Sequence, residues 1–484
     1  MGNRRIKIWF VILAALTIAA LAYTFAGAAS IRATADEVEY VQKESCGDPS
    51  AAEGASAVFS NSTGYGPGIS WTAELSFSGG RDEIKVSHRF FETAEQRTSA
   101  PYWNQIQIEA SFDKSPEIDA LAREIALGIK PGEHTVAEIR MSDILDYVPV
   151  MAHYYIGTSS YYSFVSYNAD TKQQEVTYEV NGALGELFRK MMPEDLVASL
   201  RVNRWEDKNG EMGITYYIES MTEGDEDSNI MVTGQYYDGA FYIFHYMSRP
   251  YGSFEPLADG SDPYKVYRLP VKDEGLDEYN KTYYGLDMDS ISVIGEYEEG
   301  FDIFGSSVMA DGTGAMVVGT AGGRFKAYVI DFAQGGSLQA LDLGPETEDH
   351  TVVFKDDWFL LEAPGDGYYV VYPEGGAYAV FFAPTDGSVE AADLHHIQPY
   401  EHYRAFDAGF RDGKLIVSDF AGIETTVIRP NGYTYKGVQG NGISLAVYSE
   451  NGLEYYVRYE SSLYGLRYYL ISEGMCSTEV RLAD

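Results

Sequence analysis

The residues best suited to bind a metal lie close together in the last quarter of the chain. Asp393, His395, His396 and His402 fall within ten residues, and Glu401 precedes the last of them. Imidazole nitrogens and carboxylate oxygens are common ligands of zinc. In a strand, however, the two adjacent histidines point to opposite faces, and the spacing matches no zinc motif. A zinc site and a polar loop are therefore both open interpretations.

A second candidate is an acidic segment with oxygen atoms at alternate positions. Asp225, Asp227 and Asn229 are placed like the first three ligands of a calcium-binding loop. The glycine that such a loop needs at its sixth position is replaced by Ile230, and no glutamate stands at the twelfth position. We therefore expect no cofactor, with calcium at this segment as the alternative; a solvated acidic turn explains the same residues.

The common catalytic signatures are absent from the sequence. It contains no G-x-S-x-G turn, no H-E-x-x-H pair, no C-x-x-C pair and no phosphate-binding G-x-x-x-x-G-K-[ST] loop. Carboxylate pairs for glycoside hydrolysis are a different case, because 73 acidic residues offer many pairs and only their separation in space identifies one. We therefore assign no catalytic residue.

Tyrosine and cysteine usage raises two further questions. Three of the adjacent tyrosine pairs are candidates to line a sugar groove: Tyr236-Tyr237, Tyr283-Tyr284 and Tyr468-Tyr469. Neighbouring residues of a strand normally face opposite sides, however, so one tyrosine of each pair is expected to face the core. The only cysteines are Cys46 and Cys476. They are either two free thiols or one disulfide that joins the two ends, which an oxidising compartment permits.

The first thirty residues determine the compartment in which these side chains work. Ile8 to Ile31 contains no charged side chain, and roughly 20 apolar residues cross a bilayer as a helix. Arg4, Arg5 and Lys7 precede it, and basic residues stay on the cytoplasmic side. We expect a single-pass anchor with a cytoplasmic N-terminus and an extracytoplasmic bulk. Cleavage near Ala28, followed by secretion, is the alternative.

The charge of the chain restricts its partners. The formal net charge is −38, and so negative a surface repels the phosphate backbone, which excludes nucleic acid as a partner. Apart from the membrane reached through the N-terminal helix, the expected partners are an envelope protein complex or a glycan.

The region after the anchor divides by composition into two parts. Residues 32–68 are rich in charged and small side chains, which predicts a flexible tether. Residues 69–144 contain alternating strand patterns and one helix that begins after Ser115, an N-cap residue followed by Pro116. We expect a small α+β module here. A second helical stretch is expected from about Ala183 to Leu200, broken at Pro193, where Pro193-Glu194-Asp195 resembles a helix start.

From Asn181 onward, Asn-Gly and Asp-Gly dipeptides are frequent. They supply the positive φ angles of tight hairpins. Asp366-Gly367 and Asp412-Gly413 begin similar units 46 residues apart, and related units follow Asp311-Gly312 and Asn451-Gly452. A period of roughly 40–55 residues is typical of propeller blades. Residues 145–484 therefore predict a β-propeller of about seven blades, with a β-sandwich array as the alternative.

This organisation resembles bacterial membrane-anchored extracytoplasmic β-propeller proteins. The resemblance lies in the pattern over residues 145–484; no WD, Kelch, YWTD or Asp-box motif is present, so it implies no functional residues. The expected scaffold, tether and anchor, together with the lack of a catalytic motif, predict a non-enzymatic binding, sensing or accessory scaffold protein of the cell envelope. A carbohydrate-active or other hydrolytic enzyme with its site in the propeller channel is the alternative.

Overall fold

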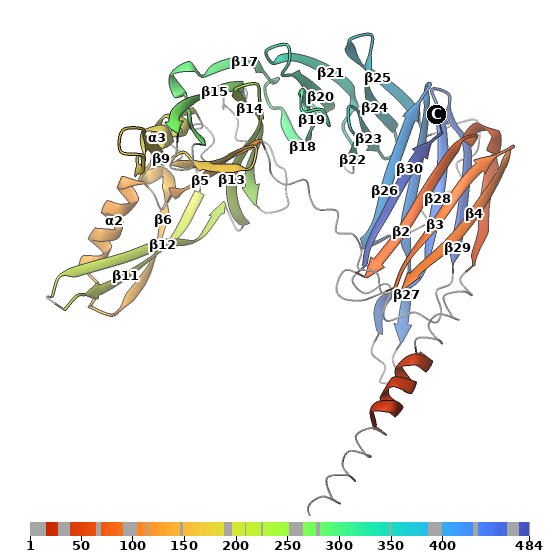
Figure 1. Cartoon of the computed structure of the whole chain (residues 1–484), viewed down its shortest axis with the longest axis horizontal. Helices are drawn as coiled ribbons and strands as arrows, with labels where there is room; N and C mark the ends of the chain where they lie inside the picture. Colours follow the sequence, from red (N-terminus) through yellow and green to blue (C-terminus); the bar gives the residue numbers. More distant parts are fainter. Residues whose placement is uncertain are drawn as a thin grey trace, which may run out of the picture.

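The protein is mainly β. The computed structural model describes residues 16–27, 39–63, 69–90, 104–112, 115–145, 149–187, 196–208, 210–223, 226–250, 265–276, 281–347, 350–385, 399–428, 434–461 and 474–483. In this part of the chain the strands form six sheets, whose larger members follow one another along an arch (Figure 1). The smallest sheet is a hairpin of β9 (Val165–Asn168) and β10 (Gln173–Val176).

The largest sheet has eleven strands. They are β5 (Gln105–Ala110), β6 (His134–Arg140), β7 (Val150–Ile156), β8 (Ser159–Tyr162), β11 (Leu196–Glu206), β12 (Met212–Glu223), β13 (Glu226–Tyr237), β14 (Ala240–Pro250), β15 (Lys265–Leu276), β16 (Thr282–Leu286) and β17 (Ser292–Glu296). Since β6 pairs with β11, and β5 pairs with β7 and β13, the expected boundary at residue 144 runs through one sheet. The structure does not separate an α+β module from the strands that follow.

One end of this sheet is an arm of β6, β11 and β12, covered on one face by α2 (Pro116–Leu127). Ser115 caps the helix, because its side-chain oxygen accepts a hydrogen bond from the Ile118 N–H at 3.1 Å. Ile118 and Ala122 are fully buried in the same core cluster as Leu200 of β11. The helix predicted after Ser115 is confirmed.

The second predicted helix is only partly correct. The structure has α3 (Glu179–Leu187), but Leu196–Leu200 belongs to β11 rather than to a helix. Leu196, Ala198 and Leu200 are buried, while Val197 and Ser199 between them are more exposed. This period of two is that of a strand with one covered face.

Three four-stranded meanders come next, each formed by consecutive strands. The first is β18 (Asp302–Val308), β19 (Gly314–Ala321), β20 (Arg324–Asp331) and β21 (Ser337–Pro345). The second is β22 (Thr351–Phe354), β23 (Phe359–Ala363), β24 (Gly367–Glu374) and β25 (Ala377–Pro384). The third is β26 (Pro399–Arg411), β27 (Lys414–Ile428), β28 (Thr434–Ser449) and β29 (Gly452–Ser461). Short 3₁₀ turns occupy Pro49–Ala52, Met141–Asp143 and Met288–Ser290.

These meanders stack face to face, and the alternation of side chains along each strand holds the stack together. In β23, Phe359 and Leu361 pack into a cluster with Val318 of the preceding meander. Leu360, between them, packs into a different cluster with Leu415 of the following meander. The middle sheet is therefore buried on both faces, which explains why β23 is apolar almost without interruption.

The two ends of the chain build the last layer. β1 (Tyr40–Gly47) pairs with β29, and β30 (Gly474–Leu482), β2 (Ala55–Thr63), β3 (Ile69–Ser78) and β4 (Arg81–Phe90) form a sheet that packs on the third meander as a sandwich. Phe59 and Ala57 are fully buried there. Most of the predicted tether, residues 40–63, is thus folded: its small side chains allow close packing between sheets, which composition alone does not reveal.

Individual hairpin turns predicted from the Asn-Gly and Asp-Gly dipeptides are confirmed, but the predicted starting points of the repeats are wrong. Asp238-Gly239 and Asp412-Gly413 connect neighbouring strands with positive φ at both residues, as type I′ turns require. β27, in contrast, continues through Gly422 without a turn, and its pairing with β28 shifts register nearby. The meanders begin at residues 302, 351 and 399, so the true repeats start elsewhere than at the dipeptides.

At the N-terminus, residues 16–27 form a helix (Figure 1). Among the helices that the structure describes, none combines the length and the low polarity that a membrane span requires. The predicted anchor from Ile8 to Ile31 extends beyond the described residues on both sides and stays a prediction.

Candidate functional site

The two metal candidates of the sequence lie mostly outside the described part of the chain. Asp393, His395 and His396 fall there entirely, and His402 is described only as a backbone position of β26. Among the described residues, no group of three or more histidine, cysteine or acidic side chains is arranged to hold a metal ion. The zinc site stays a prediction.

The calcium candidate has the wrong backbone for a binding loop. Asp225 lies outside the described residues, but Asp227 and Asn229 belong to β13. Their backbones pair with Thr222 of β12 and Arg249 of β14. An EF-hand type loop is a non-repetitive turn around its ion, so the structure places these two residues in a sheet instead.

The cysteines are carried by different sheets. Cys46 lies on β1 and its thiol is partly exposed, with its pKa raised by burial and by the nearby Glu44 carboxylate. Cys476 lies on β30, and its side chain is outside the described residues. The disulfide between the two ends stays a prediction, although the strands that carry these cysteines already join the ends.

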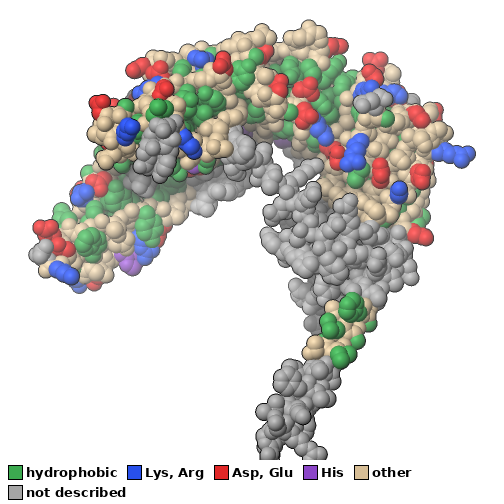
Figure 2. All heavy atoms as spheres, in the orientation of Figure 1, with side chains coloured by type: hydrophobic (Ala, Val, Ile, Leu, Met, Phe, Trp, Pro, Cys, Tyr) green, Lys and Arg blue, Asp and Glu red, His purple; other side chains and the backbone are tan. Residues whose placement is uncertain are grey.

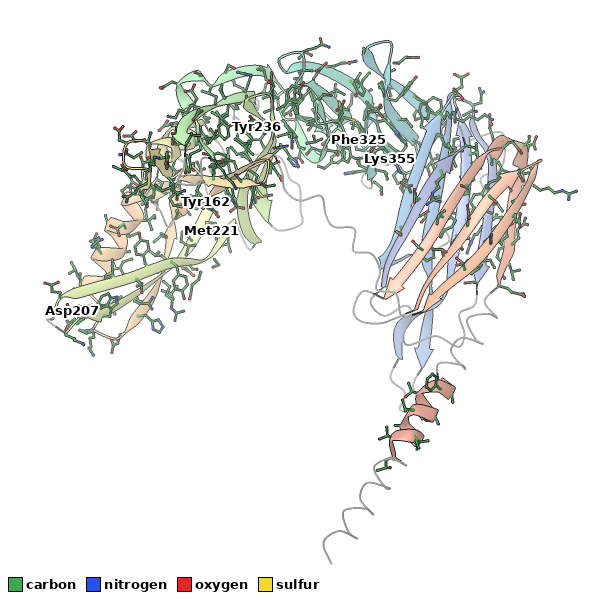
Figure 3. The ribbon with its side chains drawn as sticks, in the orientation of Figure 1. Tyr162, Asp207, Met221, Tyr236, Phe325 and Lys355 are labelled. Atoms are coloured by element: carbon green, nitrogen blue, oxygen red, sulfur yellow. The ribbon has the colours of Figure 1, made fainter. Side chains whose placement is uncertain are left out.

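The two candidate tyrosine pairs that the structure describes, Tyr236-Tyr237 and Tyr283-Tyr284, do not form a sugar groove. Tyr283 is buried against Tyr161 and Tyr167, with ring centroids 5.1 and 5.3 Å apart. Tyr236 and Tyr237 contact the rings of Phe241 and Phe332 on either side of the sheet, at 5.3 and 6.3 Å; Tyr236 is labelled in Figure 3. Tyr468-Tyr469 lies outside the described residues. The described pairs therefore fill the core.

A cavity of about 480 Å³ lies between the first and second meanders. Phe325 and Lys355 mark these two sheets in Figure 3. Its lining consists of Met309, Ala310, Asp311, Thr313, Val329, Asp331, Asp356, Asp357 and Tyr378. We call it the acidic pocket, because four of these residues are aspartates and no lysine, arginine or histidine is among the described residues that line it. Its volume suits a small organic ligand.

Turns at one end of the two meanders position the carboxylates. Asp311 follows β18, and its Oδ1 accepts hydrogen bonds from the N–H and the hydroxyl of Thr313, at 2.9 and 2.7 Å. Asp331 ends β20 and accepts hydrogen bonds from Gln334 N and Nε2, at 3.0 and 2.8 Å. Asp356 belongs to the turn between β22 and β23. These carboxylates are thus fixed by their own turns and are present before any ligand binds.

Hydrogen bonds between the two sheets hold the pocket together. The Ala310 N–H donates to the Asp356 carbonyl at 2.9 Å. Gln339 of β21 donates from Nε2 to the Tyr378 carbonyl at 2.8 Å and accepts from the Tyr378 N–H at 2.9 Å. The relative position of the two walls is therefore determined by polar contacts as well as by the apolar core beneath them.

The pKa of Tyr378 reflects its burial and the negative charge of the aspartates in the pocket. Burial raises the pKa of its hydroxyl to about 12, and the charges of Asp357, Asp311 and Asp331 add to this effect. The hydroxyl stays protonated at neutral pH and lies 3.5 Å from the sulfur of Met309. In contrast, the hydrogen bonds from Thr313 lower the pKa of Asp311, which keeps that carboxyl charged. A cation near the ring gains from both the carboxylates and the aromatic face.

One residue of this pocket, Asp311, lies in a turn that the sequence predicts, although the sequence does not mark it as a binding residue. Asp311-Gly312 was expected to be a hairpin turn, and it is one. Asp331 and Asp356-Asp357 belong to turns of different strands, so only the stacking of two sheets brings them together. A carboxylate at the same turn of successive repeats is the signal that could have found it, once the repeat frame was correct.

Comparisons with known proteins add no functional assignment. No protein family and no curated protein matches the chain. A structure of a protein from Lactobacillus plantarum is similar over 88% of this chain and 99% of that chain, at 10% identity and a TM-score of 0.24. A second structure, of a protein from Bacteroides fragilis described as a "putative 6-phosphogluconolactonase", is similar over 90% of this chain and 100% of that chain, at 10% identity and a TM-score of 0.20. At such TM-scores these similarities carry no argument about fold or activity.

Proposed function

We propose that the protein is a membrane-anchored, extracytoplasmic binding protein of the cell envelope, and that its acidic pocket takes a small organic cation such as an amine. The observation that carries the proposal is the lining: four aspartates and a tyrosine ring around a cavity of about 480 Å³. The consecutive meanders, stacked face to face, support a propeller-like scaffold. The seven-blade count and the anchor belong to the same proposal.

Titration calorimetry with spermidine tests the binding function. The full chain is expected to bind spermidine more weakly as salt rises, since exposed charges are screened. Asp357→Asn should weaken binding, because it removes one charge of the pocket. The control, Asp170→Asn, removes an exposed aspartate in the β9–β10 turn, outside the pocket, and should leave binding unchanged. Calcium chloride serves as the comparison ion. Binding of calcium without spermidine, or equal affinity in both variants, contradicts the proposal.

The second candidate is hydrolysis, which the convergence of carboxylates favours. A glycosidase needs one carboxyl with a raised pKa as general acid, whereas the pKa of Asp311 is lowered by its hydrogen bonds. This favours binding over acid catalysis at that residue. Turnover of a panel of nitrophenyl glycosides, abolished by Asp356→Asn or Asp357→Asn, would instead establish the enzyme.

The location has its own measurement. Mass spectrometry of protein extracted from membranes distinguishes a retained anchor, in which residues 1–28 remain, from a secreted product that begins near Ala28. Detection of the intact N-terminus supports the anchored form.

A further inference from the structure

The arm of β6, β11 and β12 has one covered face and one open face. Leu200 and Ile218 lie on the face that packs against α2. Arg201 and Tyr217, which pair with each other and alternate with those residues, lie on the opposite face. Figure 2 shows hydrophobic side chains beside basic and histidine side chains on this arm, and its tip at Asp207 points away from the rest of the molecule in Figure 3.

Two aromatic rings are displayed on the open face. Trp205 is 48% exposed and Tyr217 is 46% exposed. A Cβ added at Gly213 would lie 2.2 Å from the Trp205 indole, so the ring lies directly over the Gly213 backbone and is held by it. Trp205 is four residues from Arg201, the partner of Tyr217. At about 3.3 Å per residue, the rows that carry the two rings are about 13 Å apart.

Polar side chains fill the space between the rings. Asn203 donates hydrogen bonds to the carbonyl and the hydroxyl of Thr215, both at 3.3 Å. Arg201 forms an ion pair with Glu219, and its Nη2 donates to His134 Nε2 at 2.7 Å. These contacts fix the polar groups in place, so little conformational entropy remains to be lost on binding.

We propose that this aromatic strip (Trp205, Tyr217 and the residues between them: His134, Arg201, Asn203 and Thr215) binds a linear, β-linked glycan. The flat C–H faces of two pyranose rings stack on the two aromatic rings, and sugar hydroxyls between them exchange hydrogen bonds with Asn203 and Arg201. The strip is separate from the acidic pocket and goes beyond the cation-binding function.

A glycan fits this face better than a protein does. Trp, Tyr and Arg are also enriched at the centres of protein interfaces, where they gather in desolvated pockets. Here the rings are separated by hydrogen-bonding side chains on an open sheet. Each sugar of a linear glycan has an apolar face and a polar edge. A row of aromatic rings separated by hydrogen-bonding side chains can contact both.

The test titrates the full chain with cellohexaose, chitohexaose and, as an α-linked comparison, maltohexaose. We expect binding of at least one β-linked hexasaccharide, with weaker binding of maltohexaose, whose chain curls. Trp205→Ala and Tyr217→Ala should each weaken the affinity about tenfold, equivalent to about 1.4 kcal/mol. Tyr178→Ala removes a tyrosine that is 55% exposed outside the strip and should leave the affinity unchanged.

Gly213→Ala provides a variant that keeps both rings. Its methyl group displaces the Trp205 indole from its seat, so the affinity should fall although no ring is lost. Circular dichroism and the melting temperature check that each variant is folded. The proposal is overturned if neither β-linked hexasaccharide binds, or if the ring variants bind as tightly as the parent.

Discussion

At the scale of single residues, burial decides what a charge contributes. Lys355 Nζ lies 2.5 Å from Asp407 Oδ1, and Asp407 is only 6% exposed. The other oxygen of this carboxylate accepts a hydrogen bond from the Val480 N–H at 2.7 Å. One carboxylate thus joins the turn after β22, the strand β26 and the C-terminal strand β30. Lys355, labelled in Figure 3, is the cation that compensates it.

Replacing Lys355 should therefore destabilise the protein strongly. Lys355→Met leaves a buried carboxylate without its cation, and breaking such a pair costs about 3 kcal/mol. Arg324→Met is the matched control, because Arg324 and Asp342 are about half exposed and surface pairs contribute only about 0–1 kcal/mol. Urea unfolding measures both. Equal losses of stability in the two variants would contradict this account.

Asp311 predicts a pH dependence in the acidic pocket. Its pKa is lowered because Thr313 donates two hydrogen bonds to it. A lowered folded-state pKa stabilises the fold above the unfolded value of about 3.9, and this contribution is lost as the pH falls through the folded value. Thr313→Val removes one donor and should raise the pKa of Asp311. Carboxyl NMR titration shows the shift, and an unchanged midpoint would exclude the mechanism.

The residue scale is also where the sequence was least informative about function. Asp393, His395 and His396 were attractive because they are close along the chain, yet the carboxylates that converge in the described structure come from three separate turns. Proximity in sequence marks a site only when one loop supplies all of its ligands. In stacked sheets, neighbouring turns supply them instead.

At the scale of elements, local signals such as helix caps and hairpin dipeptides predict structure correctly. The extent of the long strands is predicted poorly. Ser115 and Pro116 identify α2, because capping is a contact within a few residues. Asp412-Gly413 identifies a hairpin for the same reason. In contrast, Leu196–Leu200 was assigned to a helix, since a short apolar run fits either period.

The cap of α2 can be tested directly. Ser115 is 2% exposed and accepts the hydrogen bond of the Ile118 N–H. Ser115→Ala should lower the free energy of unfolding by about 1 kcal/mol, while Ser115→Thr, which retains the hydroxyl, should lower it less. Chemical denaturation provides the measurement. A fully stable alanine variant would show that the cap contributes nothing to the fold.

At the scale of the whole molecule, the ends of the chain are its least predictable part. Ser60 and Ser477, whose hydroxyls lie 2.7 Å apart, are separated by 417 residues. No local pattern encodes such a pairing, so residues 40–63 were predicted to be a tether. The alternation in β2 is real, but Ala55 and Ala57 are small, and their burial becomes evident only when the opposing sheet is known.

Truncation distinguishes a tether from a strand pair. A chain that starts at residue 39 keeps β1 and β2, so it should melt at the same temperature as the full chain. A chain that starts at residue 69 loses β1 and β2, exposes Ile443 and Leu445 of the third meander, and should lose cooperative unfolding of the sandwich. Differential scanning calorimetry compares the two. Identical transitions would mean that residues 40–63 are dispensable.

The pairing of β2 with β30 also imposes an order on biosynthesis. Ala55 needs Leu482 as its partner, so β2 waits with an open edge until nearly the whole polypeptide has been translated. Synthesis from the N-terminus makes this edge long before its partner. During that interval the exposed strand is an aggregation hazard, so a chaperone that meets the growing chain would have its earliest and longest engagement here.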